Sequence, residues 1–534
     1  MDDFFLSDKR SEIRELRAVM SCCVRCAMRF AGVRDPTAYQ LPEQELEEAA
    51  AAVGAAEQAA AASSSNDDAS AAAETAVVAP PEICPLCLGC LQHCLRPDAV
   101  ERVANVVRAA GYESLDFSLA VSLPVQLMVR ERGCWLHLQQ TRAAAKAAED
   151  GGGVPLIGDG RNQAATYAHH GDLRSPRFDA IVDVKDALRW ALTPPLARAL
   201  GLPNDPASAL NLHVNLSHKG VDGEHHGLLA SLVPAESAYN KRKRHNQGQA
   251  VEYDSIRVVQ RALGMERADN LLRTSSKHCP PSSPGAPCVV SVTCERAPIT
   301  LSGRYCKFAR DLPQSPWIID GARKCEGSVS ECITDVLVPL YGASDARFHS
   351  AGREDVDVRM LGEGRPFLIE LVSPKRALHS PEALAECIER INASGLMAIS
   401  GLEVSDHAAV SEIMKEGEEA HRKDYRCVVC LGRPATAADV ALLNGTKEVV
   451  CQQLTPMRVL HRRTLIVRER TVHSMSAVLL GSRFLQLDLT TQAGTYVKEF
   501  VHGDFGRTNP SLGSLLGCEA DIMQLDVMGL HGDE

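Results

Sequence analysis

Apolar residues recur at helical spacing near the start of the chain. From Ile13 to Met20 they fall three or four positions apart, and Ser7 or Ser11 is placed to cap the first turn, so the pattern predicts a helix over residues 7–30. A second helical pattern runs over residues 99–110. Between them, residues 42–80 are rich in Ala, Glu and Ser and carry no such periodicity. We expect this low-complexity insert to be a solvated loop or linker, because it offers too little apolar surface to join a core.

Alternating and continuous apolar runs predict further strands and helices over residues 113–140 and 178–232. A polar, glycine-rich insert at about 148–176 separates them. Serine- and proline-rich stretches that end at position 288 mark the main domain border. The pattern therefore predicts an N-terminal accessory domain over residues 1–288 and a second domain over residues 289–534.

The most informative pattern surrounds a group of acidic residues in the second domain. Apolar residues alternate over residues 356–360, which predicts a strand with one apolar face. Gly362 and Gly364 predict a turn, and residues 367–372 predict a return strand. Asp355 then lies where a loop enters the first strand, and loops held by a rigid sheet are common places for catalytic groups. Taken alone, the Gly-Arg-x-Asp sequence that ends at Asp355 also fits a surface turn with an Arg–Asp pair.

Composition is that of an ordinary soluble globular protein. The 534 residues suggest about three to four domains, and the chain is 45% hydrophobic and 23% charged. These values exclude collagen-like, wholly disordered and small disulfide-scaffold proteins. The net charge of −11 is uneven, because residues 41–79 carry eight acids and no Lys or Arg, which leaves 57 basic against 60 acidic residues elsewhere. A nucleic-acid site would therefore be a local basic patch.

Membrane and export signals are not expected. No uncharged apolar stretch reaches the roughly 18 residues that favour a membrane-spanning helix. The N-terminus lacks the basic region and long apolar core of a secretory signal. The 19 cysteines, an odd number, are therefore expected to be reduced thiols, some of them bound to metal.

Two Cys-x-x-Cys pairs flank the low-complexity insert: Cys23 with Cys26, and Cys84 with Cys87. Each such turn supplies two thiolates, and two turns complete the closed tetrahedral site of a structural Zn²⁺ ion. The long gap between the pairs is tolerable, because the entropy of loop closure grows slowly with loop length. Redox pairs or plain buried thiols are the alternative interpretation.

Other cysteines leave the ligand set open. Cys22, Cys90 and Cys94 lie close enough in sequence to replace one of the four. A third pair, Cys427 and Cys430, has no partner pair and lies in an apolar, strand-like run. We interpret that third pair as buried core thiols.

Several segments of the second domain resemble one enzyme family. Residues 352–355 resemble the signature of pseudouridine synthases, whose catalytic aspartate closes a short Gly-Arg-x-Asp stretch. The wider match is to the archaeal and eukaryotic tRNA pseudouridine synthases with an N-terminal THUMP-like accessory domain, the family numbered ten among the eukaryotic synthases. Its other blocks are similar to residues 303–310, 317–321, 455–463, 494–504 and 525–527. The two inserts, at 42–80 and 148–176, depart from the family pattern.

The resemblance implies an isomerase (an intramolecular transferase) that needs no organic cofactor. By motif position its nucleophile is Asp355, with Glu354 and Asp357 as local rivals. Lys498 corresponds to the basic partner that keeps the nucleophile ionised, at a position where many relatives carry Arg. An exposed strand lysine is the alternative for Lys498.

Two tyrosines also fall on family positions. Tyr425 matches the catalytic tyrosine, which would stack on the flipped-out uracil and assist proton transfer at its carbon 5. Tyr496 matches a second tyrosine at the pocket wall. Core tyrosines with tethered hydroxyl groups are the alternative.

Basic residues indicate where RNA would bind. Arg458, Arg462 and Arg463 open an arginine-rich run, and we assign them, with Arg353 of the motif, to substrate contacts such as phosphates. A solvated strand face is the alternative. A second basic run at residues 241–245 fits an RNA contact, a nuclear import signal or a solvated loop equally well.

The expected fold is α+β, with a mixed, mainly antiparallel catalytic sheet, flanking helices and an N-terminal zinc-containing THUMP-like domain. The family implies action on uridine 55, and in some members uridine 54, of the tRNA TΨC arm. We further expect a monomer of the nucleus and cytoplasm with no membrane partner. The alternative function is a zinc-containing RNA-binding scaffold, for example in microRNA-precursor processing, and a thiol oxidoreductase is a distant third.

Overall fold

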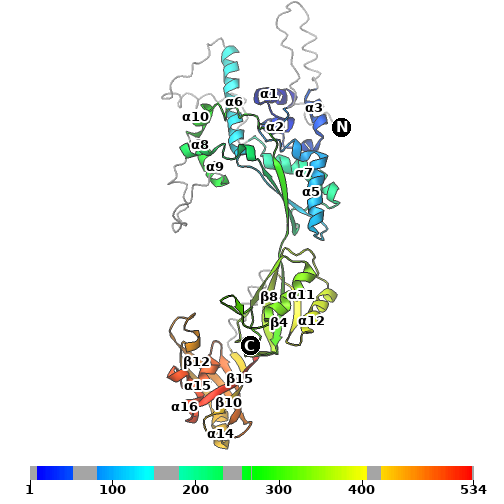
Figure 1. Ribbon diagram of the computed structural model, residues 1–534. Coiled ribbons are helices and arrows are strands. Elements are labelled where there is room, and N and C mark those ends of the chain that lie inside the picture. The colour runs from blue at the N-terminus through cyan, green and yellow to red at the C-terminus, as the bar shows by residue number, and fades with distance from the viewer. Residues whose placement is uncertain are drawn as a thin grey trace, which may run out of the picture. The chain divides into compact units, whose positions relative to one another are not determined.

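The chain divides into two compact units, Met1–Glu295 and Arg296–Glu534. The computed structural model describes residues 9–51, 81–149, 180–232, 255–265, 267–405 and 422–531 (Figure 1). The predicted border at residues 288 and 289 falls slightly earlier than the observed one. The reason is strand β3 (Val289–Arg296), which adds to the N-terminal sheet and so carries these residues into the first unit. Lys241–His245 and the greater part of both inserts lie outside the described residues.

The N-terminal unit is mainly helical around a small sheet. Its sheet has the order β1-β2-β3, in which β1 (Ser118–Ser122) and β2 (Leu210–Ser217) run parallel. Its α-helices are α1 (Arg10–Met20), α2 (Val24–Phe30), α3 (Glu43–Ala51), α5 (Pro97–Ala110), α6 (Gln126–Glu149), α7 (Val184–Leu200), α8 (His226–Leu232), α9 (Ile256–Leu263) and α10 (Ala268–Arg273). None of the helices in the described part of the chain is both long and apolar enough to cross a membrane.

The single helix predicted over residues 7–30 is wrong, because the structure has two helices there. The chain breaks at Ser21, whose φ of 47° is left-handed, and Cys23 then adopts an extended conformation before α2 begins. Ile13, Leu16 and Met20 are buried in α1, as their spacing predicts. Cys23 is the N-cap residue of α2, and Cys26 lies in its first turn.

The low-complexity insert also begins differently from the prediction. Its first residues form α3 rather than a solvated loop. Leu46 and Ala50 are fully buried on one side of that helix. Glu47 pairs with Arg17 of α1 at 2.7 Å. Four residues of spacing between Leu46 and Ala50 are enough to give the short helix an apolar stripe.

The C-terminal unit is built on one ten-stranded sheet of order β14-β11-β12-β13-β10-β15-β8-β4-β9, with β7 also paired to β8. The β15–β8 pair is parallel, and the other described pairs of this sheet are antiparallel. The strands are β4 (Ile299–Lys307), β7 (Asp345–Ser350), β8 (Arg359–Val372), β9 (Met397–Val404), β10 (Arg422–Leu431), β11 (Lys447–Leu454), β12 (Val467–Leu479), β13 (Phe484–Gln492), β14 (Thr508–Asn509) and β15 (Ala520–His531). The predicted mixed, mainly antiparallel sheet is confirmed.

Helices flank this sheet. They are α11 (Val329–Tyr341), α12 (Pro381–Asn392), α14 (Ala437–Gly445), α15 (Val497–His502) and α16 (Leu512–Leu516). Figure 1 shows α11 and α12 together beside β4 and β8. Local sequence explains several of their starts: Ser328 caps α11, and Thr436 with Asp439 forms a capping box at α14. Outside these layers, β5 (Ile318–Ile319) and β6 (Ala322–Arg323) form a small hairpin.

The predicted turn at Gly362 and Gly364 is wrong, because β8 runs through both residues as one strand. Each glycine has a positive φ, 63° and 79°, and both lie where the pairing of β8 with β4 shifts its register, between Met360 and Arg365. A Cβ at Gly362 would lie 2.1 Å from the carbonyl oxygen of Met528, and one at Gly364 would lie 2.7 Å from that of Tyr305. The glycines are therefore there because neighbouring strands approach closely, and not because the chain turns.

The prediction that the third cysteine pair is buried in the core holds for Cys427 but not for Cys430. Cys427 on β10 is fully buried, and burial raises the pKa of its thiol. Cys430 is half-buried at the end of the same strand. Neither belongs to a cluster of metal-ligating side chains in the described residues.

The glycine in the middle of β8 gives a stability prediction. Gly362→Ala should lower the free energy of unfolding by about 2–5 kcal/mol, because the new methyl group meets a neighbouring backbone as well as a left-handed φ. Gly395→Ala is the matched control. Its φ of +67° is similar but its Cβ would meet nothing within 4 Å, so it should lose only about 1–2 kcal/mol. Denaturant unfolding of the full chain measures both, and equal losses would contradict the steric explanation.

Candidate functional site

One cavity of about 970 Å³ in the C-terminal unit collects the active-site and RNA-contact residues that the sequence predicts for this unit. These residues are Arg353, Asp355, Tyr425, Arg458, Arg462, Arg463, Tyr496 and Lys498. They come from the β7–β8 loop, from β10, from the segment after β11 and from the start of α15. The fold therefore brings together segments that are more than 140 positions apart in the chain, such as those of Asp355 and Lys498.

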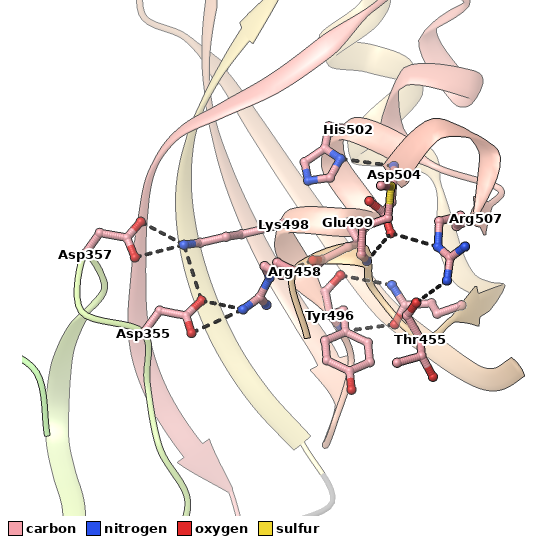
Figure 2. Close-up of polar contacts among 12 residues, drawn as sticks. Asp355, Asp357, Thr455, Arg458, Tyr496, Lys498, Glu499, His502, Asp504 and Arg507 are labelled. Atoms are coloured by element: carbon pink, nitrogen blue, oxygen red, sulfur yellow. Dashed lines mark hydrogen bonds and ion pairs between the residues drawn. The ribbon is translucent and has the colours of Figure 1, made fainter. Parts of the chain in front are cut away.

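The carboxylate of Asp355 lies between two cations (Figure 2). Its Oδ2 is 3.0 Å from the Arg458 guanidinium and 3.3 Å from Lys498 Nζ. About a third of the Asp355 side chain is exposed, so the carboxylate is accessible from the cavity. Two cations therefore hold the carboxylate in place while it remains reachable from the cavity.

Lys498, the basic partner predicted from the sequence, is shared between two carboxylates. Its Nζ donates to both Asp357 carboxylate oxygens, at 2.9 Å and 2.8 Å, which is closer than its approach to Asp355. Burial opposes ionisation of Asp357, but the hydrogen bonds and charge of Lys498 lower the pKa of this carboxyl below its usual value. Lys498 lies on α15, so the alternative of an exposed strand lysine does not fit.

Arg458 is the nearer cation, and sequence reasoning missed this contact. It was assigned to RNA contacts, whereas its guanidinium bonds to Asp355 and also donates through Nε to Glu499 Oε1 at 2.8 Å. Glu499 is buried, with 2% of its surface exposed. Burial alone would lower the pKa of Arg458, but Glu499 and Asp355 more than offset that effect and raise it. Arg458 is therefore charged at any working pH.

Together these side chains form an alternating chain of charges. It runs Glu499–Arg458–Asp355–Lys498–Asp357, and every neighbouring pair lies within 3.3 Å. The end at Glu499 is buried, whereas the Asp357 side chain is half exposed. The only sequence signal for Glu499, at the buried end, was its position directly after the predicted Lys498.

The start of α15 is fixed by a side chain of β11. Gln453 is fully buried and exchanges two hydrogen bonds with Tyr496, the N-cap residue of the helix: its amide donates to the Tyr496 carbonyl and accepts from the Tyr496 N–H, both at 2.9 Å. Lys498 and Glu499 follow directly in the first turn. Gln453 was not predicted as a site residue, and its sequence context carries no signal beyond a strand position.

The loop that carries Arg458 is tied down in a similar way. Arg458 lies on the short 3₁₀ helix η7 (Met457–Val459). The N–H of Met457 donates to Asp504, and Arg507 donates to the carbonyl of Thr455 (Figure 2). The alternative of a solvated strand face therefore does not fit Arg458. Arg462 and Arg463 lie beyond η7 and are exposed, as is Arg353 of the motif.

Tyr425 lines the cavity from β10, in register with Val527 of β15. Its side chain is half-buried, and burial raises the pKa of its phenol to about 12. The hydroxyl group is therefore protonated at neutral pH. Lys423, two residues earlier on the same strand face, also lines the cavity. Burial and the nearby Arg365 charge lower the pKa of Lys423 to about 8.

The local rival Glu354 has a different role from Asp355. Its carboxylate accepts a hydrogen bond from Arg365 at 2.9 Å and another from the Tyr305 hydroxyl at 3.0 Å. Only 5% of Glu354 is exposed. Because its oxygens already bind these partners beneath the loop, Glu354 is unsuited to attack a substrate, and Asp355 is the better candidate.

The four cysteines of the two Cys-x-x-Cys pairs converge in the N-terminal unit. All four are buried, and the sulfur atoms of Cys23, Cys26, Cys84 and Cys87 lie within 4.8 Å of one another. The sulfurs of Cys23 and Cys87 are 3.9 Å apart. Zn–S bonds of about 2.3 Å in a tetrahedron place neighbouring sulfurs about 3.8 Å apart, so the donor set fits a closed Zn²⁺ site.

The surroundings of this cluster suit thiolates. The N–H of Cys23 donates to the Cys84 sulfur at 3.3 Å, and the Arg29 guanidinium lies 4.0 Å from the Cys26 sulfur. In the protein without metal, burial raises the pKa of Cys26, whereas hydrogen bonds from the neighbouring thiols lower that of Cys84 despite its burial. Among the described residues, Cys22, Cys90 and Cys94 are not part of the four-cysteine group.

Two family models match the chain. The model described as Pus10, C-terminal, matches residues 300–531, and the model described as eukaryotic Pus10, N-terminal, matches residues 84–150 and 170–294. The first match covers the whole cavity described above. The second covers one of the two cysteine pairs and most of the N-terminal unit.

Similar proteins carry the same family name. The "tRNA pseudouridine synthase Pus10" of Xenopus laevis is 35% identical over 99% of this chain and 98% of its own length. The protein of the same name from Homo sapiens is 37% identical over 84% of this chain and 78% of its own length. The Thermofilum pendens protein of the same name is 38% identical over 44% of this chain and 53% of its own. Among solved structures, a Cbf5–Nop10–Gar1 complex is 14% identical over 43% of this chain and 50% of that chain, with a TM-score of 0.25. The family resemblance seen in the sequence is confirmed: the chain belongs to the Pus10 family and is an isomerase of the pseudouridine synthase class.

Proposed function

We propose that the protein is a tRNA pseudouridine synthase that isomerises uridine 55 of the TΨC arm, alone or together with uridine 54, with Asp355 as the nucleophile. The observation that carries the proposal is the accessible Asp355 carboxylate held between Arg458 and Lys498 in a cavity lined by both predicted tyrosines. The Xenopus laevis relative, which matches nearly the whole chain, is named a tRNA pseudouridine synthase, and this supports tRNA as the substrate.

The chemistry uses an ionised carboxylate and no organic cofactor. The reaction breaks the C1′–N1 glycosidic bond, rotates the uracil and forms a C1′–C5 bond, after which C5 loses a proton and N1 gains one. Asp355 attacks either the sugar or the base to hold the fragments together. Arg458 and Lys498 hold its carboxylate in place before attack and stabilise its negative charge when it leaves.

The aromatic groups handle the flipped-out base. Tyr425 presents its ring to the cavity and stacks on the uracil. Because the pKa of Tyr425 is about 12, its hydroxyl acts at neutral pH as a hydrogen-bond donor, and its part in proton transfer at carbon 5 needs a partner to take the phenol proton. Tyr496, the N-cap residue of α15, forms a second part of the cavity wall.

Exposed cations at the cavity provide the RNA contacts. Arg353, Arg462 and Arg463 are exposed at its edge and have no carboxylate partner among the ion pairs of the described residues. Phosphate contacts of this kind position the RNA without reading its sequence. The N-terminal unit, with a structural Zn²⁺ on Cys23, Cys26, Cys84 and Cys87, is the THUMP-like tRNA-binding module of this proposal. The protein acts as a monomer in the nucleus and cytoplasm.

Asp355→Asn tests the nucleophile. It should abolish pseudouridine formation while tRNA affinity stays within about threefold of the wild-type value, since the amide keeps the shape but cannot attack. Carbodiimide primer extension on an unmodified transcript maps the product, and filter binding gives the affinity. Asp357→Asn, which removes only the outer partner of Lys498, should retain most activity. An active Asp355→Asn protein would refute the assignment, and an inactive wild-type protein that binds tRNA tightly would favour the RNA-binding scaffold.

Glu499→Gln tests the buried end of the charge chain. Losing the charged hydrogen bond to Arg458, worth about 1.5–3 kcal/mol, should reduce the single-turnover rate by about 10–100-fold. Affinity for tRNA should not change, because Glu499 is buried and does not line the cavity. The control Glu448→Gln alters an exposed carboxylate on β11 and should leave the rate unchanged. A wild-type rate in the Glu499 variant would show that Arg458 needs no such partner.

Cys84→Ser tests the metal centre. The purified wild-type protein should contain about one Zn²⁺ per chain, and the variant should lose that zinc and become less soluble, because the closed site needs four ligands. Cys90→Ser changes a buried cysteine outside the cluster and should keep the zinc. Elemental analysis by mass spectrometry measures both. Equal zinc content in the two variants would contradict the assigned ligand set.

A further inference from the structure

Lys307, at the end of β4, is the outstanding buried charge of the C-terminal unit. Its side chain is 0% exposed, and it is absent from the residues that line the cavity. Lysines are almost never fully buried unless they are paired, because the ammonium group loses its hydration. A buried lysine beside an active site therefore needs a structural explanation.

The ammonium group of Lys307 is satisfied by main-chain carbonyls. It donates to the carbonyl oxygens of Leu312 at 2.9 Å, Asp355 at 3.0 Å and Val356 at 3.2 Å. These three bonds use all three donors of an ammonium group. Two of the three acceptors are the peptide carbonyls of the predicted nucleophile and of the residue that follows it.

Charge also favours the cation at this position. Burial lowers the pKa of Lys307, and the negative charges of Glu354, Asp357 and Asp355 oppose that change. The ammonium group thus lies beneath an acidic loop. It attracts that loop as a whole, in addition to binding its carbonyls.

Two other side chains, the buried Arg365 and the half-buried Gln314, hold earlier parts of the same loop. Arg365 donates to the carbonyl of Ala351 at 2.9 Å, and Gln314 donates to that of Gly352 at 2.9 Å. Glu354 is bound by Arg365 and by Tyr305. Among the hydrogen bonds of the described residues, Lys307 is the side chain that binds the main-chain carbonyl of Asp355 itself.

We propose that Lys307 is a positioning residue for the nucleophile: its buried ammonium group fixes the main chain at Asp355 and Val356 and so aims the Asp355 carboxylate into the cavity. The inference rests on the proposed function, which makes Asp355 the nucleophile. Displacing a reacting group by about 1 Å can reduce a rate by about 100-fold, so a fixed main chain at this point has a direct effect on rate. Lys307 does not touch the substrate.

The test compares full-length variants in single-turnover reactions with an unmodified tRNA transcript. Lys307→Met keeps the length of the side chain and removes both the charge and the donors. We expect its rate constant to fall by about 30-fold or more, while the dissociation constant for tRNA stays within about threefold of wild type. Lys307→Gln, which keeps an N–H donor without the charge, should fold more readily and still lose about 10-fold or more in rate.

Arg310→Met is the matched control. Arg310 also binds a main-chain carbonyl of this loop, that of Asp357 at 2.8 Å, but not that of Asp355. The single-turnover rate constant of the Arg310→Met variant should stay within about threefold of the wild-type value. Melting temperatures of all variants separate a loss of folded protein from a loss of rate.

The outcomes separate this inference from the proposed function. A wild-type rate in folded Lys307→Met, or in Lys307→Gln if the Met variant does not fold, would overturn the positioning role while leaving Asp355 as nucleophile. A rate loss matched by an equal loss of tRNA affinity would also overturn it. If Asp355→Asn, measured in parallel, remains active, Asp355 is not the nucleophile. That result contradicts the proposed function itself, and the inference that rests on it. Lowered rates with retained affinity in both Lys307 variants, beside a normal Arg310 variant, support the inference.

Discussion

The proposed active site depends on one electrostatic arrangement, a carboxylate that is held between two cations and yet left accessible. Asp355 achieves this as the middle member of the chain Glu499–Arg458–Asp355–Lys498–Asp357. Each cation is shared with a second acid: Arg458 with Glu499, and Lys498 with Asp357.

Most of the surrounding structure serves to hold the members of this chain in place. Gln453 fixes the helix start that presents Lys498 and Glu499, and Asp504 holds the turn that carries Arg458. Beneath the Asp355 loop, Lys307 and Arg365 bind main-chain carbonyls. The supporting groups are buried side chains bonded to backbone, which restrict the loops more than exposed ion pairs do.

In the N-terminal unit, cysteine sulfurs bring distant segments of the chain together. Cys23 and Cys26 meet Cys84 and Cys87 across a long insert, and a bound ion would join helix α2 to the turn before α5. Close thiolates repel one another without such an ion, whereas Zn²⁺ turns the same four groups into a cross-link. The break at Ser21 separates α1 from α2, whose N-cap residue is Cys23.

The sequence by itself determined the family, the nucleophile candidate and the two cysteine pairs, because these are carried by short motifs. The mixed sheet was expected from the family resemblance, and not from apolar periodicity. It could not separate a turn from a bent strand at Gly362, since both need a positive φ and only the approach of Met528 decides between them. It also could not assign Arg458 to Asp355 or show the buried roles of Gln453 and Lys307. Those contacts join segments far apart in the chain, and only the tertiary structure sets which of many similar residues meet.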